Sequence, residues 1–164
     1  MIGVAPKTRR KKETAGMPTL ATIVVHTHTT NRSGYGYQFT PKHHGGDWDA
    51  AQWLPSLTLD EEFAVFDSGD EHDSSDKQGR LYGVRRSNDM LLDLGTWAQQ
   101  IAEFPAVRTG VEWHGYPIWA VNELAPGNRR GENGRPDKEV FLKMERAGLL
   151  TLRERKRLFK GDHV

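Results

Sequence analysis

The chain has 164 residues, of which 36% are hydrophobic, 17 are glycine and none is cysteine. This length is enough for one hydrophobic core, and the lack of cysteine excludes disulfide bonds, thiolate metal sites and a cysteine nucleophile. The net charge of +1 balances two basic ends against an acidic middle: residues 1–46 hold seven Lys or Arg against one acidic residue, 47–94 hold four against twelve, and 128–164 hold eleven against six. Such a distribution favours a basic face that binds an anionic partner, while the acidic stretch can shield that face or contact another subunit.

The N-terminal part of the chain is expected to contain a tail and a strand. Residues 1–18 include the basic run from Lys7 to Lys12 and few apolar side chains, which predicts a disordered basic tail. Residues 19–164 are expected to form a single domain. Thr19 to Thr30 has the pattern of a strand, and its apolar run from Leu20 to Val25 is too short for a membrane span. We therefore expect no membrane segment and a cytoplasmic location.

The middle of the chain predicts strands around one helix. Leu59 to Phe66 fits either a helix or a strand, and Ser68 to Gln78 is an acidic loop. Arg80 to Arg85 predicts a short strand, Asp89 to Phe104 a helix, and Val111 to Val121 a hairpin or bent strand. The order of elements predicts an α+β fold: a small mixed antiparallel sheet with a central helix and a C-terminal pair of helices resembling a helix-turn-helix.

Residues 136–161 predict a helical hairpin with a tight corner. Gly148 can adopt the left-handed conformation that ends a helix, so that Leu149 folds back onto the last turn. Thr151 and Glu154 have the spacing of a capping box, which starts the second helix within about three residues of the end of the first. Because these two signals are independent and adjacent, the angle between the helices is expected to be well defined.

The second helix of this hairpin is strongly basic and predicts an anionic partner. The hairpin resembles the prokaryotic helix-turn-helix, but Met144 stands where that motif has a small residue and Glu154 where it has an aliphatic one. Phosphate contact is therefore expected rather than base reading. A solvated charged face is the alternative interpretation. The candidate phosphate-binding residues are Arg129, Arg130, Arg153, Arg155, Lys156, Arg157 and Lys160.

An aromatic stripe precedes the acidic middle. In the predicted strand from Ser33 to Phe39, aromatic residues occupy every second position, and Arg32 lies just before them. This pattern resembles the RNP1 element of the RNA-recognition motif, which implies bases stacked on Tyr35 and Tyr37. The same alternation is also the ordinary pattern of a strand that buries one face in a core.

Clustered histidines form a second kind of candidate site. The His26-Thr27-His28 pair resembles the H-x-H of JAMM metalloproteases, which implies a zinc-dependent hydrolase; that family continues with S-x-x-D, whereas Ser56 to Asp60 has one residue more. Imidazole nitrogens are good ligands for zinc and other divalent transition metals. Local hydrogen bonds at the end of a strand are the alternative. The candidate metal ligands are His26, His28, His43 and His44.

Three hypotheses about function follow. In the first, the chain is a small non-enzymatic nucleic-acid-associated protein, or a subunit of a nucleoprotein assembly, that contacts phosphates through its basic C-terminal helix. In the second, it is a metal-dependent hydrolase, such as a nuclease or toxin-like enzyme, with a histidine-rich site. In the third, it is a protein–protein adaptor whose acidic region and basic terminus pair with other chains.

Overall fold

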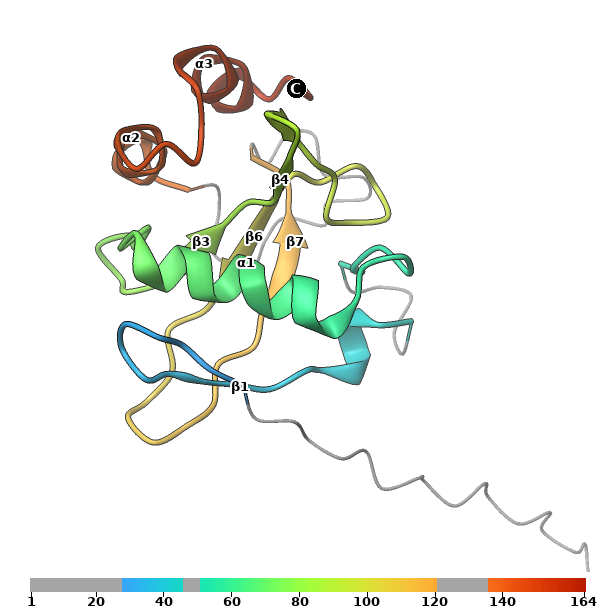
Figure 1. The fold of residues 1–164 in the computed structure, drawn as a ribbon, viewed down its shortest axis with the longest axis vertical. Helices are drawn as coiled ribbons and strands as arrows, with labels where there is room; N and C mark the ends of the chain where they lie inside the picture. Colours follow the sequence, from blue (N-terminus) through green and yellow to red (C-terminus); the bar gives the residue numbers. More distant parts are fainter. Residues whose placement is uncertain (1–27, 46–50, 121–135) are drawn as a thin grey trace, which may run out of the picture.

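A central three-stranded antiparallel sheet organises the computed structural model, which describes residues 28–45, 51–120 and 136–164 (Figure 1). The sheet has the order β3–β6–β7, formed by Leu81–Gly83, Ile101–Phe104 and Tyr116–Ile118. Two further pairs are β1 (His28–Thr29) with β2 (Gly36–Tyr37), and β4 (Arg86–Ser87) with β5 (Met90–Leu91). The helices are η1 (Pro41–His43, 3-10), α1 (Leu59–Glu71), α2 (Lys138–Arg146) and α3 (Leu152–Lys160). The α+β class predicted from the sequence is confirmed.

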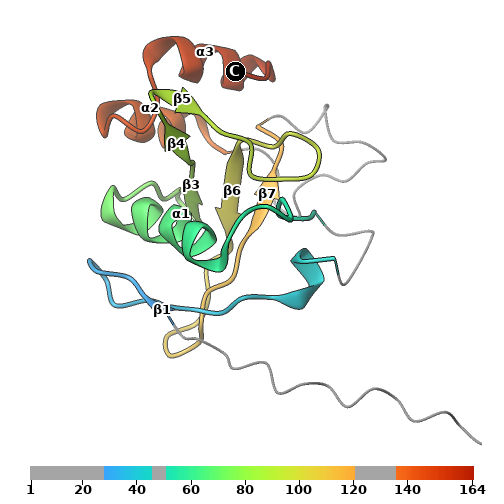
Figure 2. The same cartoon turned by 45° about the vertical axis from the view of Figure 1, so that its right-hand side comes forward.

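Both faces of the central sheet are buried, against different helices. Because side chains alternate along a strand, Leu81 and Phe104, which pair across β3 and β6, lie on one face and pack with α1. Tyr82 and Ile101 point to the other face and pack with apolar residues of α2 and α3. Figure 2 shows α2 and α3 at the end of the molecule that also carries β4 and β5. The sheet therefore lies between a cluster that includes α1 and a cluster that includes α2 and α3.

Helix α1 begins with a capping box and lies unusually close to the sheet. The Thr58 hydroxyl accepts from the Glu61 N–H at 3.2 Å, and the Glu61 carboxylate accepts from the Thr58 N–H at 2.8 Å. A Cβ on Gly83 of β3 would lie 2.3 Å from the carbonyl oxygen of Val65, so only glycine permits this approach. The sequence pattern of residues 59–66 fitted either a helix or a strand, and the structure shows a helix. This helix continues through Glu71, into the segment that was predicted as an acidic loop.

The predicted helix from Asp89 to Phe104 was wrong. This segment contains β5 and β6, joined by a turn in which Gln99 O accepts from the N–H groups of Leu94 and Gly95 at 2.6 and 3.2 Å. The apolar residues do not share one helical face: Leu91 packs in the cluster with α2 and α3, and Leu94 packs in the cluster with α1. The spacing of these apolar residues resembles that of a helix because residues of one segment pack into two different hydrophobic clusters.

Residues 28–44, which we call the strap segment, run along α1 (Figure 1). Asn31 donates to Asp67 through its backbone N–H and its side-chain amide, both at 2.9 Å. Ser33 donates to Asp70 through its backbone N–H at 3.0 Å and its hydroxyl at 2.6 Å. Two carboxylates on successive turns of α1 thus accept hydrogen bonds from the strap segment.

Some predictions lie outside the described residues: the basic tail 1–18, most of the strand predicted over 19–30, His26, and the pair Arg129 and Arg130. The strand predicted over 33–39 is present as the shorter β2. Among the helices of the described ranges, none combines the length and the apolar content that crossing a bilayer requires.

Candidate functional site

The corner between α2 and α3 has the geometry that the sequence predicts. Gly148 has φ +77°, in the left-handed region. The Leu149 N–H donates to Met144 O at 2.9 Å, and the Gly148 N–H donates to Glu145 O at 3.0 Å. This pair of bonds is the Schellman motif, which satisfies the last carbonyl groups of a helix. Helix α2 starts at Lys138, two residues later than predicted.

Helix α3 begins with the predicted capping box. Its N-cap Thr151 accepts from the Glu154 N–H at 3.2 Å, and the Glu154 carboxylate accepts from the Thr151 N–H at 2.7 Å. Arg86 of β4 donates to the same carboxylate at 2.6 Å. Burial favours a higher pKa for the Glu154 carboxyl, but the bonds from Arg86 and Thr151 outweigh it and lower the pKa below its ordinary value. An ionised Glu154 therefore ties α3 to the β4–β5 hairpin.

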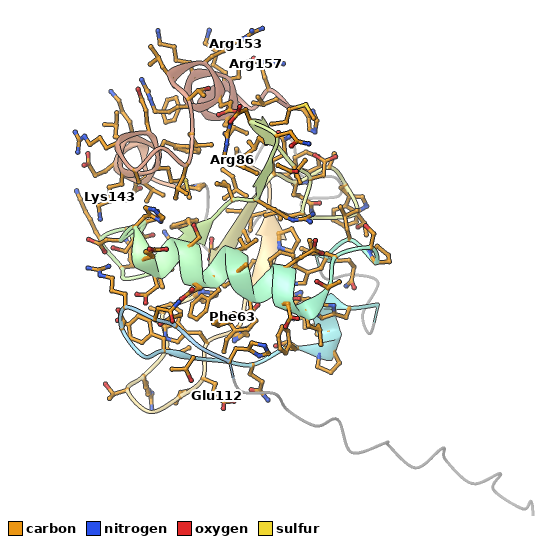
Figure 3. The ribbon with its side chains drawn as sticks, in the orientation of Figure 1. Phe63, Arg86, Glu112, Lys143, Arg153 and Arg157 are labelled. Carbon is orange, nitrogen blue, oxygen red and sulfur yellow. The ribbon has the colours of Figure 1, made fainter. Side chains whose placement is uncertain are left out.

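The outward side of α3 carries four cationic side chains. Positions 153, 156, 157 and 160 follow the i, i+3, i+4, i+7 spacing of one helical face. Arg153, Lys156 and Lys160 are exposed, and Arg157 is half-buried with one bond from its guanidinium to His163 O at 2.5 Å. Figure 3 shows Arg153 and Arg157 on α3 at the end of the molecule farthest from the strap segment. We call these four residues, Arg153, Lys156, Arg157 and Lys160, the basic stripe.

Arg155 does not belong to the basic stripe, although the sequence grouped it with the phosphate-binding residues. Its guanidinium forms an ion pair with Glu145 of α2, and its side chain is only 16% exposed. Residues 153 and 155 are two positions apart on a helix and so point in different directions. The structure thus divides the charged run into an inner set that braces the corner and an outer set that faces solvent.

The two candidate tyrosines have different environments. Tyr37 is fully buried, and its hydroxyl donates to Glu62 Oε1 at 2.6 Å. A base cannot reach this ring, so the stacking role predicted for Tyr37 is not compatible with the structure. Tyr35 is 38% exposed, and its ring lies against Trp113 with a centroid distance of 5.0 Å. The alternating aromatic residues therefore serve mainly as core.

The described histidines contact different partners. His28 Nε2 lies 3.2 Å from Asp60 Oδ1, His43 Nδ1 lies 2.7 Å from Ala51 O, and His44 Nε2 lies 2.8 Å from Glu62 Oε2. Within the ranges that the structure describes, no group of three or more His, Asp or Glu side chains is arranged to hold a metal ion. The zinc site predicted from these residues thus has no support from the described part of the chain.

A buried polar cluster that the sequence did not indicate lies beside α1. The Glu62 side chain is only 2% exposed and lies between the Tyr37 hydroxyl and His44. His44 Nε2 and Glu62 Oε2 are within ion-pair distance, but they are not aligned as a hydrogen bond. Burial, followed by the negative charge of Glu62, raises the pKa of Tyr37 well above its usual value. Glu62 shares the buried face of α1 with Val65 and Phe66, a helical spacing that could have marked it as an inward carboxylate.

Burial also lowers the pKa of His43, opposed by its bond to Ala51 O. The ring of His43 lies against Tyr116, with centroids 5.0 Å apart. Next to it, Tyr116 donates to Glu103 Oε1 at 3.3 Å. These side chains form an extended polar interior around the central sheet. His44 lies beside the buried Glu62 carboxylate, but their contact lacks the aligned hydrogen bond that would orient an imidazole as a general base.

The chain was compared with protein-family models, curated proteins and solved structures. No family model matches it, and no curated protein or solved structure matches it either. Function is therefore inferred from the side chains and their geometry.

Proposed function

We propose that the protein is a nucleic-acid-associated binding protein, or a subunit of a nucleoprotein assembly, that contacts phosphates through the basic stripe of α3. The observation that carries this proposal is the sorting of charges on α3. Glu154 is bonded to Arg86 and Arg155 is paired with Glu145, so these two charged side chains are engaged inside the protein. The outer face then presents cations at one-turn intervals.

This sorting has an electrostatic consequence. Cations on the same helical face repel one another, so a row of four cations is unfavourable in the free protein. An anionic partner would reduce this repulsion. The exposed residues Arg153, Lys156 and Lys160 have no ion pair within the described part of the chain. Phosphate groups of a nucleic acid carry the complementary negative charge at regular intervals.

The proposal is tested by measuring binding of fluorescently labelled DNA and RNA by anisotropy over a range of salt concentrations. For four phosphates neutralised, affinity for duplex DNA is expected to fall about 150-fold between about 50 and about 200 mM salt. The triple variant Arg153→Gln, Lys156→Gln, Lys160→Gln should reduce that fall to about 3-fold, because one cation of the stripe remains.

A matched variant controls for net charge. Lys42, Lys77 and Arg108 are exposed and lie outside α3, so replacing all three with Gln removes the same charge from other surfaces. This control is expected to keep most of the parent's salt dependence. No binding by the parent protein at low salt, or an equal loss in both triple variants, would refute the assignment of phosphate binding to α3.

The hydrolase hypothesis gains no comparable support. His28, His43 and His44 contact a surface carboxylate, a backbone carbonyl and a buried carboxylate, respectively. Each contact engages one ring nitrogen, and the three contacts go to three different residues.

A further inference from the structure

We infer that the partner of the basic stripe is double-stranded nucleic acid, held by the phosphates of its backbone. This inference rests on the proposed function and narrows it to one class of nucleic acid. Three features of the structure favour a duplex over a single strand or a lipid surface. The stripe is braced along its length, the exposed aromatic side chain of the described residues lies elsewhere, and Leu158 of α3 is buried in the core.

The stripe is braced before any partner binds. At its first turn, Glu154 is held by Arg86 at 2.6 Å and by the capping box. In the middle, Arg155 is paired with Glu145 of α2. At its end, Gly161 has φ +89°, and the Asp162 N–H donates to Arg157 O at 3.0 Å. The backbone positions of the four cations are therefore set by the fold.

A fixed array of cations suits a fixed array of phosphates. From residue 153 to residue 160 the helix rises about 10 Å, which sets the distance between the ends of the stripe. A duplex holds its phosphates in a regular arrangement, so neither partner must be ordered on binding. A flexible single strand would lose conformational freedom in matching the same array, and that cost opposes binding.

Aromatic side chains for base stacking are absent from the exposed side of α3. Single-strand binding proteins combine a basic groove with aromatic residues on which bases stack. The aromatic residue of α3, Phe159, is partly buried and meets Phe141 of α2 edge-on, with centroids 5.9 Å apart. Within residues 28–45, 51–120 and 136–164, the exposed aromatic side chain is Tyr35. Its strap segment lies at the opposite end of the molecule from α3 (Figure 1).

The core occupies the middle and end of the apolar side of α3, while Leu152, its first residue, is 49% exposed. Leu158 is 3% exposed and packs in the cluster that contains Met144 and Ile101. A helix that binds an anionic membrane inserts its apolar face among the lipids, which α3 cannot do without leaving the sheet. The basic stripe would still be attracted to the surface charge of an anionic membrane, but the helix would not insert into it. The duplex backbone therefore fits the stripe better than a bilayer does.

The experiment compares three probes with the full chain at matched salt: a labelled DNA duplex of about 20 base pairs, one of its strands alone, and vesicles containing phosphatidylserine, with the anionic probes at equal charge concentration. We expect the duplex to bind at least about tenfold more tightly than the single strand. The expected slope of log affinity against log salt is about −3.6 for a duplex with four contacts.

Each other outcome overturns a different claim. A single strand that binds as tightly as the duplex refutes the duplex inference while leaving the proposed function intact. Binding to vesicles alone, or to none of the three probes, refutes both. The Arg153→Gln, Lys156→Gln, Lys160→Gln variant must lose duplex affinity relative to the Lys42→Gln, Lys77→Gln, Arg108→Gln control; if both variants bind alike, α3 is not the contact surface.

Discussion

Arg86 and Glu154 are 68 positions apart in sequence, yet the Arg86 guanidinium donates to the Glu154 carboxylate at 2.6 Å. The same guanidinium also donates to Leu149 O at 3.3 Å and to Asp89 O at 2.6 Å. One side chain of β4 therefore joins its own hairpin, the α2–α3 corner and the first turn of α3. Since the basic stripe begins at Arg153, its position depends on this contact.

Replacing Arg86 with Ala is expected to lower the free energy of unfolding by about 2 kcal/mol, because it leaves a mostly buried carboxylate without its charged donor. Urea denaturation measures this change. Arg85→Ala is the matched control: Arg85 pairs with Glu61, where both side chains are about a third exposed, so a much smaller loss is expected. Equal losses in the two variants would contradict the bracing role of Arg86.

Stability should also fall in acid through Glu154. Its pKa in the folded protein lies below the ordinary value, so its contribution is fully present above the unfolded pKa of about 4.3 and is lost as pH falls through the folded pKa. Denaturant titrations at a series of pH values should show this loss. Glu154→Gln should make the dependence on pH shallower; an unchanged dependence would show that Glu154 is not bonded as described.

Tyr37→Phe should destabilise the protein by about 2 kcal/mol, because the buried Glu62 carboxylate loses the hydroxyl donor at 2.6 Å. Tyr35→Phe is the natural comparison, since Tyr35 is 38% exposed and its replacement should change stability little. Chemical denaturation of both variants measures the difference. A small effect at Tyr37 would contradict the buried bond between its hydroxyl and Glu62.

Two of the four tyrosines are expected to resist ionisation in the folded state. Burial, followed by Glu62, raises the pKa of Tyr37, and burial, followed by Glu103, raises the pKa of Tyr82. A group with a raised folded pKa contributes stability that is present below its unfolded pKa, about 10, and is lost as pH rises above it. Ultraviolet titration should therefore show these two phenols ionising only as the protein unfolds in alkali, and early ionisation of all four would refute their burial.

Gly83→Ala should be strongly destabilising, by about 3 kcal/mol, because the new methyl group would overlap the Val65 carbonyl oxygen at 2.3 Å and the Val65 side chain at 2.6 Å. Gly110→Ala is the comparison: no atom lies within 4 Å of its added Cβ, although φ is +82°, so only backbone strain of about 1 kcal/mol is expected. Thermal unfolding of both variants distinguishes overlap from strain.

The success of sequence reasoning depended on how local each feature was. The α2–α3 corner was predictable because Gly148, Thr151 and Glu154 act within a few residues of one another. The segment from Asp89 to Phe104 was not, because Leu91 and Leu94 are assigned to different cores by strands and helices far along the chain. Periodicity alone cannot separate two cores that share one segment.

The candidate site shows the same division. The basic character of α3 could be read from the sequence. That Arg155 is not available to a partner follows from its ion pair with Glu145 of α2, and that Glu154 faces inward follows from its ion pair with Arg86 of β4. Likewise, the alternation of Tyr35, Tyr37 and Phe39 indicated a strand with one aromatic face, and only the position of α1 shows that Tyr37 is enclosed.

The strap segment has a consequence for the order in which the chain folds. Its bonds from Asn31 to Asp67 and from Ser33 to Asp70 join residues 36 and 37 positions apart, whereas the caps of α1 and α3 join residues three apart. Closing a long loop costs entropy before its contacts form, and proteins with distant contacts fold more slowly. We therefore expect helix nuclei to form first and the strap segment to dock late, so that mutations in its contacts mainly accelerate unfolding.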